Sequence, residues 1–190
     1  MTSTWSESDI SSLLASAFAP ELSTSPSSSG PVTRRNQNGK GDGPPHATID
    51  VLLTFDERGI SNHPNHRSLY HGAVAFLKGL MKGKSGYSCP VALYTLTSTN
   101  VLRKYVGVLD SPMTMLLGAL GNLRDAATTK AASRDRELAN RLLFVSSVNQ
   151  WWKARIAMTD GHKSQMLWFR WGWITIGRYM VVNDLKRENV

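Results

Sequence analysis

The stretch TIDVLLTFDERGISNHPNHRSLYHGAVAFLKGLM, residues 48–81, decides the fold class of this 190-residue chain. Residues 48–55 alternate apolar and polar side chains, which is the period of a half-buried strand. After Pro64, with Asn65 as the N-cap, apolar residues recur at helical spacing as far as Met81, which predicts a helix of about 16 residues. The stretch therefore predicts a strand followed by a helix.

The pattern continues with further elements. Residues 90–97 and 101–109 are strand-like runs that predict a hairpin, and residues 111–123 predict a helix that begins at a Ser-Pro pair. The polar, alanine-rich residues 121–137 fit either a helix or a loop.

Residues 142–148 then predict a strand, and the tryptophan-rich residues 166–176 with residues 179–185 predict a second hairpin. No alternation of strands with crossover helices occurs. The predicted fold class is thus α+β: a single small domain with a mostly antiparallel sheet flanked by helices.

Composition changes sharply near residue 47. Residues 1–47 hold eleven serines, five of the eight prolines and a net charge of −1, which predicts a flexible, disordered N-terminal tail. Within it, residues 6–19 have the spacing of a short amphipathic helix, which either packs on its own domain or docks on a partner. Residues 48–190 carry a net charge of +9 and 14 of the 16 aromatic residues, so they are expected to form a globular basic domain.

The overall charge and the cysteine count limit the class of protein. Lys and Arg number 22 against 14 Asp and Glu, and the resulting +8 favours a polyanionic partner. The single cysteine, Cys89, excludes an intramolecular disulfide and a cysteine-based metal site. The sequence shows no apolar run of membrane-spanning length, and its start does not have the pattern of a signal peptide.

Candidate catalytic residues give only weak signals. His63, His66 and His71 fall within nine residues, a spacing that can direct two imidazoles toward one metal ion. We assign no acidic third ligand to them, and Cys89 matches no nucleophile motif. The expectation is therefore a protein that is not an enzyme and that has no metal and no cofactor.

Surface charge and apolar patches indicate binding instead. Cations without balancing acids predict a surface for membrane or nucleocapsid, formed by Lys78, Lys82, Lys84, Arg103 and Lys104. Apolar residues at the tail helix and the central helix predict self-association, through Leu13, Leu14, Phe18, Met113, Met115 and Leu116, although a core role for Leu116 is an equal alternative.

The tryptophans offer a second choice between core and surface. Strand alternation places Trp171 and Trp173 on one face with Phe169, which favours the core for these residues. Trp168 and Arg170 are then the surface candidates.

Several segments, in their order and spacing, resemble rhabdovirus matrix proteins, plant-infecting members included. They are the strand at 48–55, SNHP at 61–64, the helix containing SLY at 68–70, STNVL at 98–102, MLWF at 166–169 and VVNDL at 181–185. The tail departs from that family, because its net charge is −1 and it offers only GPPH at 43–46 in place of a Pro-Pro-x-Tyr budding motif.

The resemblance implies a viral matrix structural protein of the virion, which self-associates into a homo-oligomer. Its partners would be the viral nucleocapsid, which is nucleoprotein and RNA, an anionic membrane bound peripherally, and the cytoplasmic tail of the viral glycoprotein. It would condense the nucleocapsid and drive budding, and it would lie beneath the envelope, in host cytoplasm, at the membrane periphery and in the host nucleus. The alternative is a basic viral RNA-binding module, such as a silencing suppressor or movement-type protein.

Overall fold

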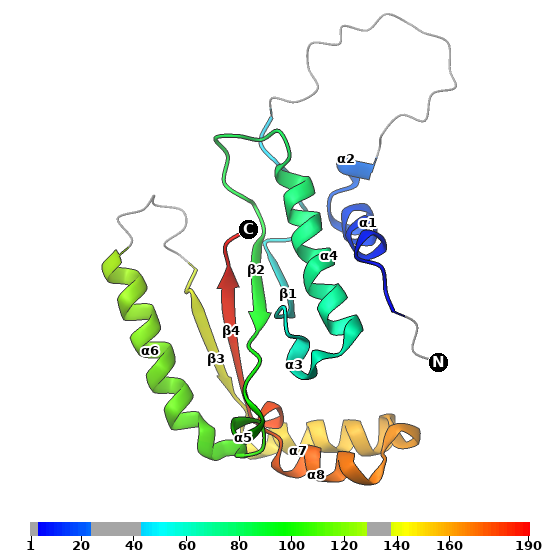
Figure 1. The fold of residues 1–190 in the computed structure, drawn as a ribbon, viewed down its shortest axis with the longest axis vertical. Helices are drawn as coiled ribbons and strands as arrows, with labels where there is room; N and C mark the ends of the chain where they lie inside the picture. The colour runs from blue at the N-terminus through cyan, green and yellow to red at the C-terminus, as the bar shows by residue number, and fades with distance from the viewer. Residues whose placement is uncertain (1–3, 24–42, 129–137) are drawn as a thin grey trace, which may run out of the picture. The chain divides into compact units, whose positions relative to one another are not determined.

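The computed structural model describes residues 4–23, 43–128 and 138–190 (Figure 1). It confirms the α+β fold class, with a mixed sheet of four strands in the order β1-β2-β4-β3 flanked by helices. Two compact units divide the chain. Unit 1 is Met1–Thr95 with Glu188–Val190, and unit 2 is Leu96–Arg187. The predicted boundary at residue 47 between tail and domain stays a prediction.

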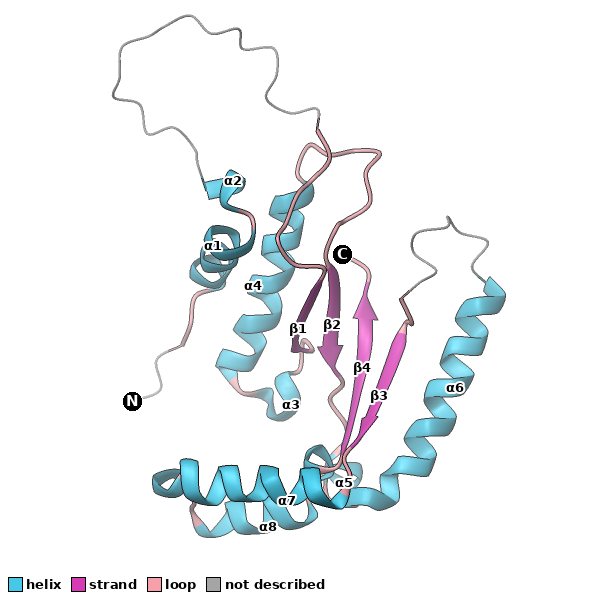
Figure 2. Cartoon of the chain, turned by 180° about the vertical axis from the view of Figure 1, so that it is seen from behind, coloured by secondary structure: helices cyan, strands magenta, loops and turns pink. Residues whose placement is uncertain are grey.

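Unit 1 is built on two helices that pack against each other. Its elements are α1 (Glu7–Phe18), α2 (Pro20–Ser23), β1 (Val51–Phe55), α3 (Gly59–Asn62), α4 (Pro64–Met81) and β2 (Ala92–Leu96, of which Leu96 falls in unit 2). Figures 1 and 2 show α1 beside α4, where Gly72 leaves room for Ile10 against the helix backbone. The buried core next to this contact contains Ala73, Phe76, Leu77, Leu80, Val91 and Leu93.

Unit 2 contains β3 (Arg141–Val145) and β4 (Val182–Glu188, of which Glu188 falls in unit 1). The two strands pair antiparallel, with Arg141 opposite Lys186 and Val145 opposite Val182. Its helices are α5 (Val101–Lys104), α6 (Ser111–Thr128), α7 (Val148–Ile156) and α8 (Trp168–Ile176). Short turns of helix complete it, at Gly107–Asp110, Ala157–Gly161, Lys163–Gln165 and Arg178–Met180.

The helix around residues 64–81 and the strands near 48–55 and 142–148 are confirmed. The cap of α4 differs from the prediction: His63 is the N-cap, its ring accepts from the N–H of Asn65, and Pro64 begins the helix. Proline suits this position, because the first N–H of a helix has no partner within it. The tail helix is also confirmed, as α1. Residues 24–42, where most of the disorder was expected, lie outside the described residues.

Both predicted hairpins are wrong. Residues 101–109 form α5 and a 3-10 turn, because the Asn100 side chain caps the N–H of Arg103 at 2.8 Å. Residues 168–176 form helix α8, and β4 pairs with β3 instead of with that segment. The undecided segment joins α6 as far as Thr128, and residues 129–137 lie outside the described part of the chain.

None of the helices in the described residues is both long enough and apolar enough to cross a membrane.

Candidate functional site in the turn between β1 and α4

The turn that follows β1 has an unusual backbone. Asp56 Oδ1 accepts hydrogen bonds from the N–H groups of Arg58 at 3.2 Å and Gly59 at 3.0 Å, which fixes the start of the turn. Ile60 and Asn62 then have positive φ angles of 63° and 57°. A β-branched residue in this conformation is strained by about 1–3 kcal/mol, and such strain clusters at functional sites.

His66 lies in the first turn of α4 and faces this strained segment. Its Nδ1 is 3.1 Å from the carbonyl oxygen of Gly59, and its ring stacks on Phe55 with 4.0 Å between centroids. Because a carbonyl oxygen only accepts, Nδ1 carries the proton, and Nε2 of the neutral ring has a free lone pair. A Cβ on Gly59 would come within 2.8 Å of the His66 Cβ, so glycine is required here.

His63 has the opposite arrangement. Its Nδ1 accepts from the N–H of Asn65 at 3.3 Å, so the proton of the neutral ring is on Nε2. The His63 and His66 rings are 5.0 Å apart between centroids. Two neighbouring imidazoles thus present a donor and an acceptor, which is an arrangement suited to general acid and base chemistry.

Acidic residues surround the same region. Burial raises the pKa of Tyr70, and the negative charges of Glu188, Glu57 and Asp56 raise it further. Sequence reasoning placed Asp56 only at the end of the first strand and gave it no role in a site, although a carboxylate directly after a strand, in Asp-Glu-Arg-Gly, is typical of a turn.

The structure brings together two of the three histidines singled out in the sequence. The His71 ring contacts Tyr70 at 5.2 Å between centroids. Within the described ranges, no three His, Cys, Asp or Glu side chains are grouped so that they could hold a metal ion. The Cys89 thiol donates to the carbonyl oxygen of Val91 at 3.3 Å, which is a structural contact.

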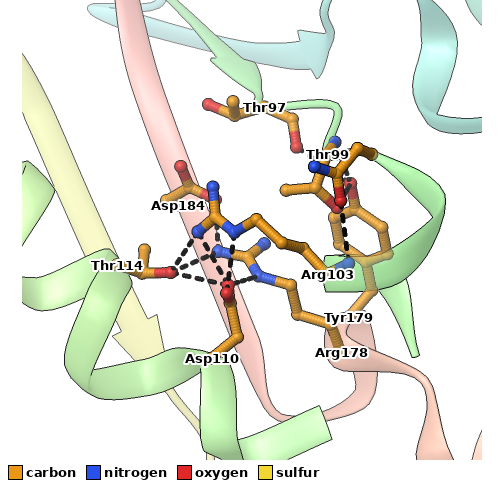
Figure 3. A network of polar contacts seen from close by, with 9 residues as sticks. Thr97, Thr99, Arg103, Asp110, Thr114, Arg178, Tyr179 and Asp184 are labelled. Carbon is orange, nitrogen blue, oxygen red and sulfur yellow. Dashed lines mark hydrogen bonds and ion pairs between the residues drawn. The ribbon is translucent and has the colours of Figure 1, made fainter. Parts of the chain in front are cut away.

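A second polar cluster lies within unit 2 and is largely buried (Figure 3). Arg178 has no exposed surface, and its guanidinium donates to Asp110, to Thr114 at 3.0 Å and to Asp184 at 2.8 Å. Arg103 donates to the other carboxylate oxygen of Asp110 at 2.7 Å. We interpret this cluster as a structural centre of unit 2, because its two arginines form ion pairs with its two aspartates.

The five predicted anion-binding cations divide between the units. Lys78 and Lys82 are exposed, and Lys84 donates to the carbonyl oxygen of Gly43 at 2.7 Å. Arg103 is tied to Asp110, and Lys104 is half-buried in α5. Anion binding by this set stays a prediction.

The six predicted self-association residues also differ in exposure. Leu13 is 69% exposed, whereas Leu14 and Phe18 pack against the core of unit 1. Met113, Met115 and Leu116 are exposed, so Leu116 is a surface residue and not a core residue. Their role in assembly stays a prediction.

The tryptophan assignments are partly wrong. Trp168 is 87% exposed, as expected, but Trp171 and Phe169 are also exposed instead of buried. The reason is the helical period of α8, which replaces strand alternation and turns both side chains outward. Trp173 is half-buried and stacks on Tyr179.

Comparison with known proteins identifies similar sequences but no matching family model and no matching solved structure. An N-acetylglucosaminyl-phosphatidylinositol de-N-acetylase of Arthroderma benhamiae is 56% identical over 204 residues, covering 100% of this chain and 57% of that protein. A probable enzyme of the same name from Schizosaccharomyces pombe is 38% identical, covering 73% of this chain and 46% of that protein. The Bos taurus enzyme is also 38% identical, covering 72% of this chain and 44% of that protein. The chain thus spans about half the length of the curated relatives it matches.

These similarities overturn the viral interpretation. The resemblance to rhabdovirus matrix proteins is wrong, because relatives at up to 56% identity are de-N-acetylases. Three further expectations are therefore wrong: a matrix protein, an RNA-binding module, and a protein without enzymatic activity. The expected nucleocapsid and glycoprotein partners are also wrong, as is the expected location in a virion or host nucleus. The matched segments were short, and none carried a chemical requirement that only one function would impose.

Proposed function

We propose that this chain is part of an enzyme that removes the acetyl group from N-acetylglucosaminyl-phosphatidylinositol. The observation that carries the proposal is the 56% identity across the whole chain to a protein named for that activity. Relatives from Schizosaccharomyces pombe, Dictyostelium discoideum, Bos taurus and Saccharomyces cerevisiae, at 27% to 38% identity, have the same name or its probable form.

De-N-acetylation is the hydrolysis of an amide. Water adds to the acetyl carbonyl carbon, the bond from that carbon to the sugar nitrogen breaks, and acetate and an amine are released. A base must take a proton from the attacking water, and an acid must supply one to the departing nitrogen.

The histidine pair at the start of α4 supports this proposal. His66 holds its free Nε2 lone pair in a fixed direction, since Gly59 and Phe55 restrain its ring, and so it suits the base. His63 carries its proton on Nε2, is exposed, and suits the acid. The two rings lie at the start of α4 with 5.0 Å between their centroids, which is close enough for both to face one substrate.

The test uses the Arthroderma benhamiae relative with its matching region replaced by this chain. Conversion of N-acetylglucosaminyl-phosphatidylinositol to the free amine is followed by mass spectrometry. We expect an active chimera, and a fall in kcat of about 100-fold or more for His66→Ala and for His63→Ala.

His71→Ala is the matched control, since His71 lies on the same helix outside the pair, and we expect it to keep kcat within about two-fold of the parent chimera. A folded but inactive parent chimera would reject the proposed function. Equal effects of all three histidine substitutions would reject the role of the pair.

A further inference from the structure

Helices α7 and α8 and residues 157–167 between them form one continuous surface of unit 2, here called the aromatic hairpin. Figures 1 and 2 both show the two helices side by side. Arg155 of α7 joins them: its Nη1 is 3.4 Å from Thr175 Oγ1, and its guanidinium carbon is 5.8 Å from the centre of the Trp171 ring.

The first half of this surface is an apolar stripe on α7. Val148, Trp152 and Ile156 follow at intervals of four residues and are 81%, 54% and 42% exposed. Helical geometry places these three side chains on one face. A surface helix normally turns such a stripe toward the core, but here it faces outward.

The second half is on α8 and is more pronounced. The exposed side of this helix carries Trp168, Phe169, Trp171 and Ile176, whereas Ile174 is fully buried. With Leu167, eight large apolar side chains of residues 148–176 are exposed. An apolar surface of this kind marks a docking site for a partner.

The charge of the aromatic hairpin indicates which partner fits. Residues 148–176 contain four cations, Lys153, Arg155, Lys163 and Arg170, against one acid, Asp160. Tryptophan rings and basic side chains together suit the interface of a bilayer, where the rings lie at the headgroups and the cations meet phosphate. RNA would call for a surface dominated by cations, and here exposed apolar side chains are twice as numerous.

A pocket between the helices adds a place for a headgroup. Its volume is about 600 Å³, and its lining includes the rings of Trp152 and Trp171, the cations of Arg155 and Lys163, and the carboxylate of Asp160. Aromatic walls with two basic groups against the one carboxylate of Asp160 give a lining of net positive charge, which fits a phosphate-bearing headgroup.

We propose that the aromatic hairpin docks this chain on the surface of a phospholipid bilayer that contains anionic lipid. Trp152 and Trp168 enter the interfacial layer, and Lys153 and Lys163 contact lipid phosphates. The inference goes beyond the de-N-acetylase activity and does not depend on it, because exposure and charge of this chain alone carry it.

The test mixes the 190-residue chain with vesicles of phosphatidylcholine, with and without phosphatidylinositol, and measures co-sedimentation and tryptophan fluorescence. We expect binding that is stronger with phosphatidylinositol, weaker at high salt, and accompanied by a blue shift. The double variant Trp152→Ser/Trp168→Ser should bind more weakly by about ten-fold or more. Lys153→Glu/Lys163→Glu should lose the preference for phosphatidylinositol while keeping all the tryptophans.

Leu102→Ser/Leu109→Ser is the matched control, since both leucines are in unit 2 and are 77% and 76% exposed. It should bind vesicles as the parent does. Circular dichroism checks that each variant is folded. If the tryptophan variant does not fold, the vesicle binding of the lysine variant tests the proposal instead.

A parent chain that fails to bind vesicles would overturn the proposal, as would equal losses in the control and tryptophan variants. Sedimentation velocity showing that the tryptophan variant loses a dimer while keeping vesicle binding would identify a second copy as the occupant instead. De-N-acetylation measured with the chimera in detergent is independent of vesicle binding, so failure of one proposal leaves the other standing.

Discussion

The fully buried guanidinium of Arg178 donates a hydrogen bond to Oδ2 of Asp110, a residue 68 positions earlier in the chain. A buried guanidinium is tolerated only where carboxylates and other acceptors replace its water shell. Asp184 supplies the second carboxylate, so a single arginine holds the turn directly before α6 and the strand β4 together within unit 2.

The Asp110 carboxylate should make stability depend on acid pH. Burial raises its pKa, but the hydrogen bonds that it accepts from two guanidinium groups and a threonine hydroxyl outweigh burial and lower the pKa from 3.8 to about 2. The unfolded chain therefore binds this proton first, so the stabilisation is complete above about pH 4 and is lost as the pH falls toward 2. We expect Asp110 to account for ~2 kcal/mol of that loss, measured by urea unfolding between pH 7 and pH 2.5.

Asp110→Asn tests this assignment directly. The variant should lose roughly 3 kcal/mol at pH 7, because Arg178 stays buried with less compensation, and its stability should fall less between pH 4 and pH 2.5 than that of the parent. Asp160→Asn, at an exposed aspartate of the same unit, should keep the parent's pH dependence. An identical acid response in Asp110→Asn and the parent would refute the explanation.

Gly59→Ala should disturb the histidine pair. The glycine has a φ of 59°, and the added Cβ would meet His66 Cβ at 2.8 Å, so the turn or the ring must move. We expect a loss of more than about 1 kcal/mol in thermal unfolding and changed NMR chemical shifts of the His66 ring.

Gly83→Ala is the matched control for that experiment. Gly83 has a similar φ of 74° but open space where the added methyl group would lie, so backbone strain of about 1 kcal/mol is its only expected cost. The chemical shifts of the His66 ring should not change in this variant. If both substitutions had the same effect on His66, the close approach at Gly59 would have no role.

Two glycines of α4 should respond to alanine with opposite signs. At Gly72 the new Cβ would lie 2.5 Å from Ile10 Cγ2, so α1 must shift away and stability should fall by about 1–3 kcal/mol. At Gly79 nothing lies within 4 Å, and alanine should stabilise the helix by roughly 0.5–1 kcal/mol. The melting temperatures of the two variants are compared with that of the parent. A Gly72→Ala variant with an unchanged melting temperature would mean that α1 does not pack on α4.

Local periodicity explains which parts of the fold could be predicted. Residues 64–81 repeat apolar side chains over five turns, and no other element type fits that spacing. The nine residues of α8 are too few to separate the two periods, and their aromatic content favours a strand by propensity alone. The pairing of β3 with β4 joins segments that the sequence pattern leaves unconnected.

The candidate site shows a similar limit. The spacing of His63 and His66 indicates that they can meet, but their opposite tautomers depend on contacts with Gly59 and Asn65. The contact with Gly59 lies in a turn with positive φ angles, and the contact with Asn65 lies at the helix cap, and composition reveals neither. The cluster around Arg178 was likewise hidden, because its members are far apart in the chain and arginine is usually exposed.

Thr48 is bonded to the last residue of α1. Its backbone N–H and its hydroxyl both donate to the carbonyl oxygen of Phe18, at 2.8 Å and 3.3 Å. These two hydrogen bonds tie the C-terminal end of α1 to the residue that leads toward β1, across 30 positions of the chain. The end of α1 is therefore held by backbone bonding as well as by the side chains that it packs against α4, so a substitution that loosens the α1 to α4 contact still leaves the helix attached at Phe18.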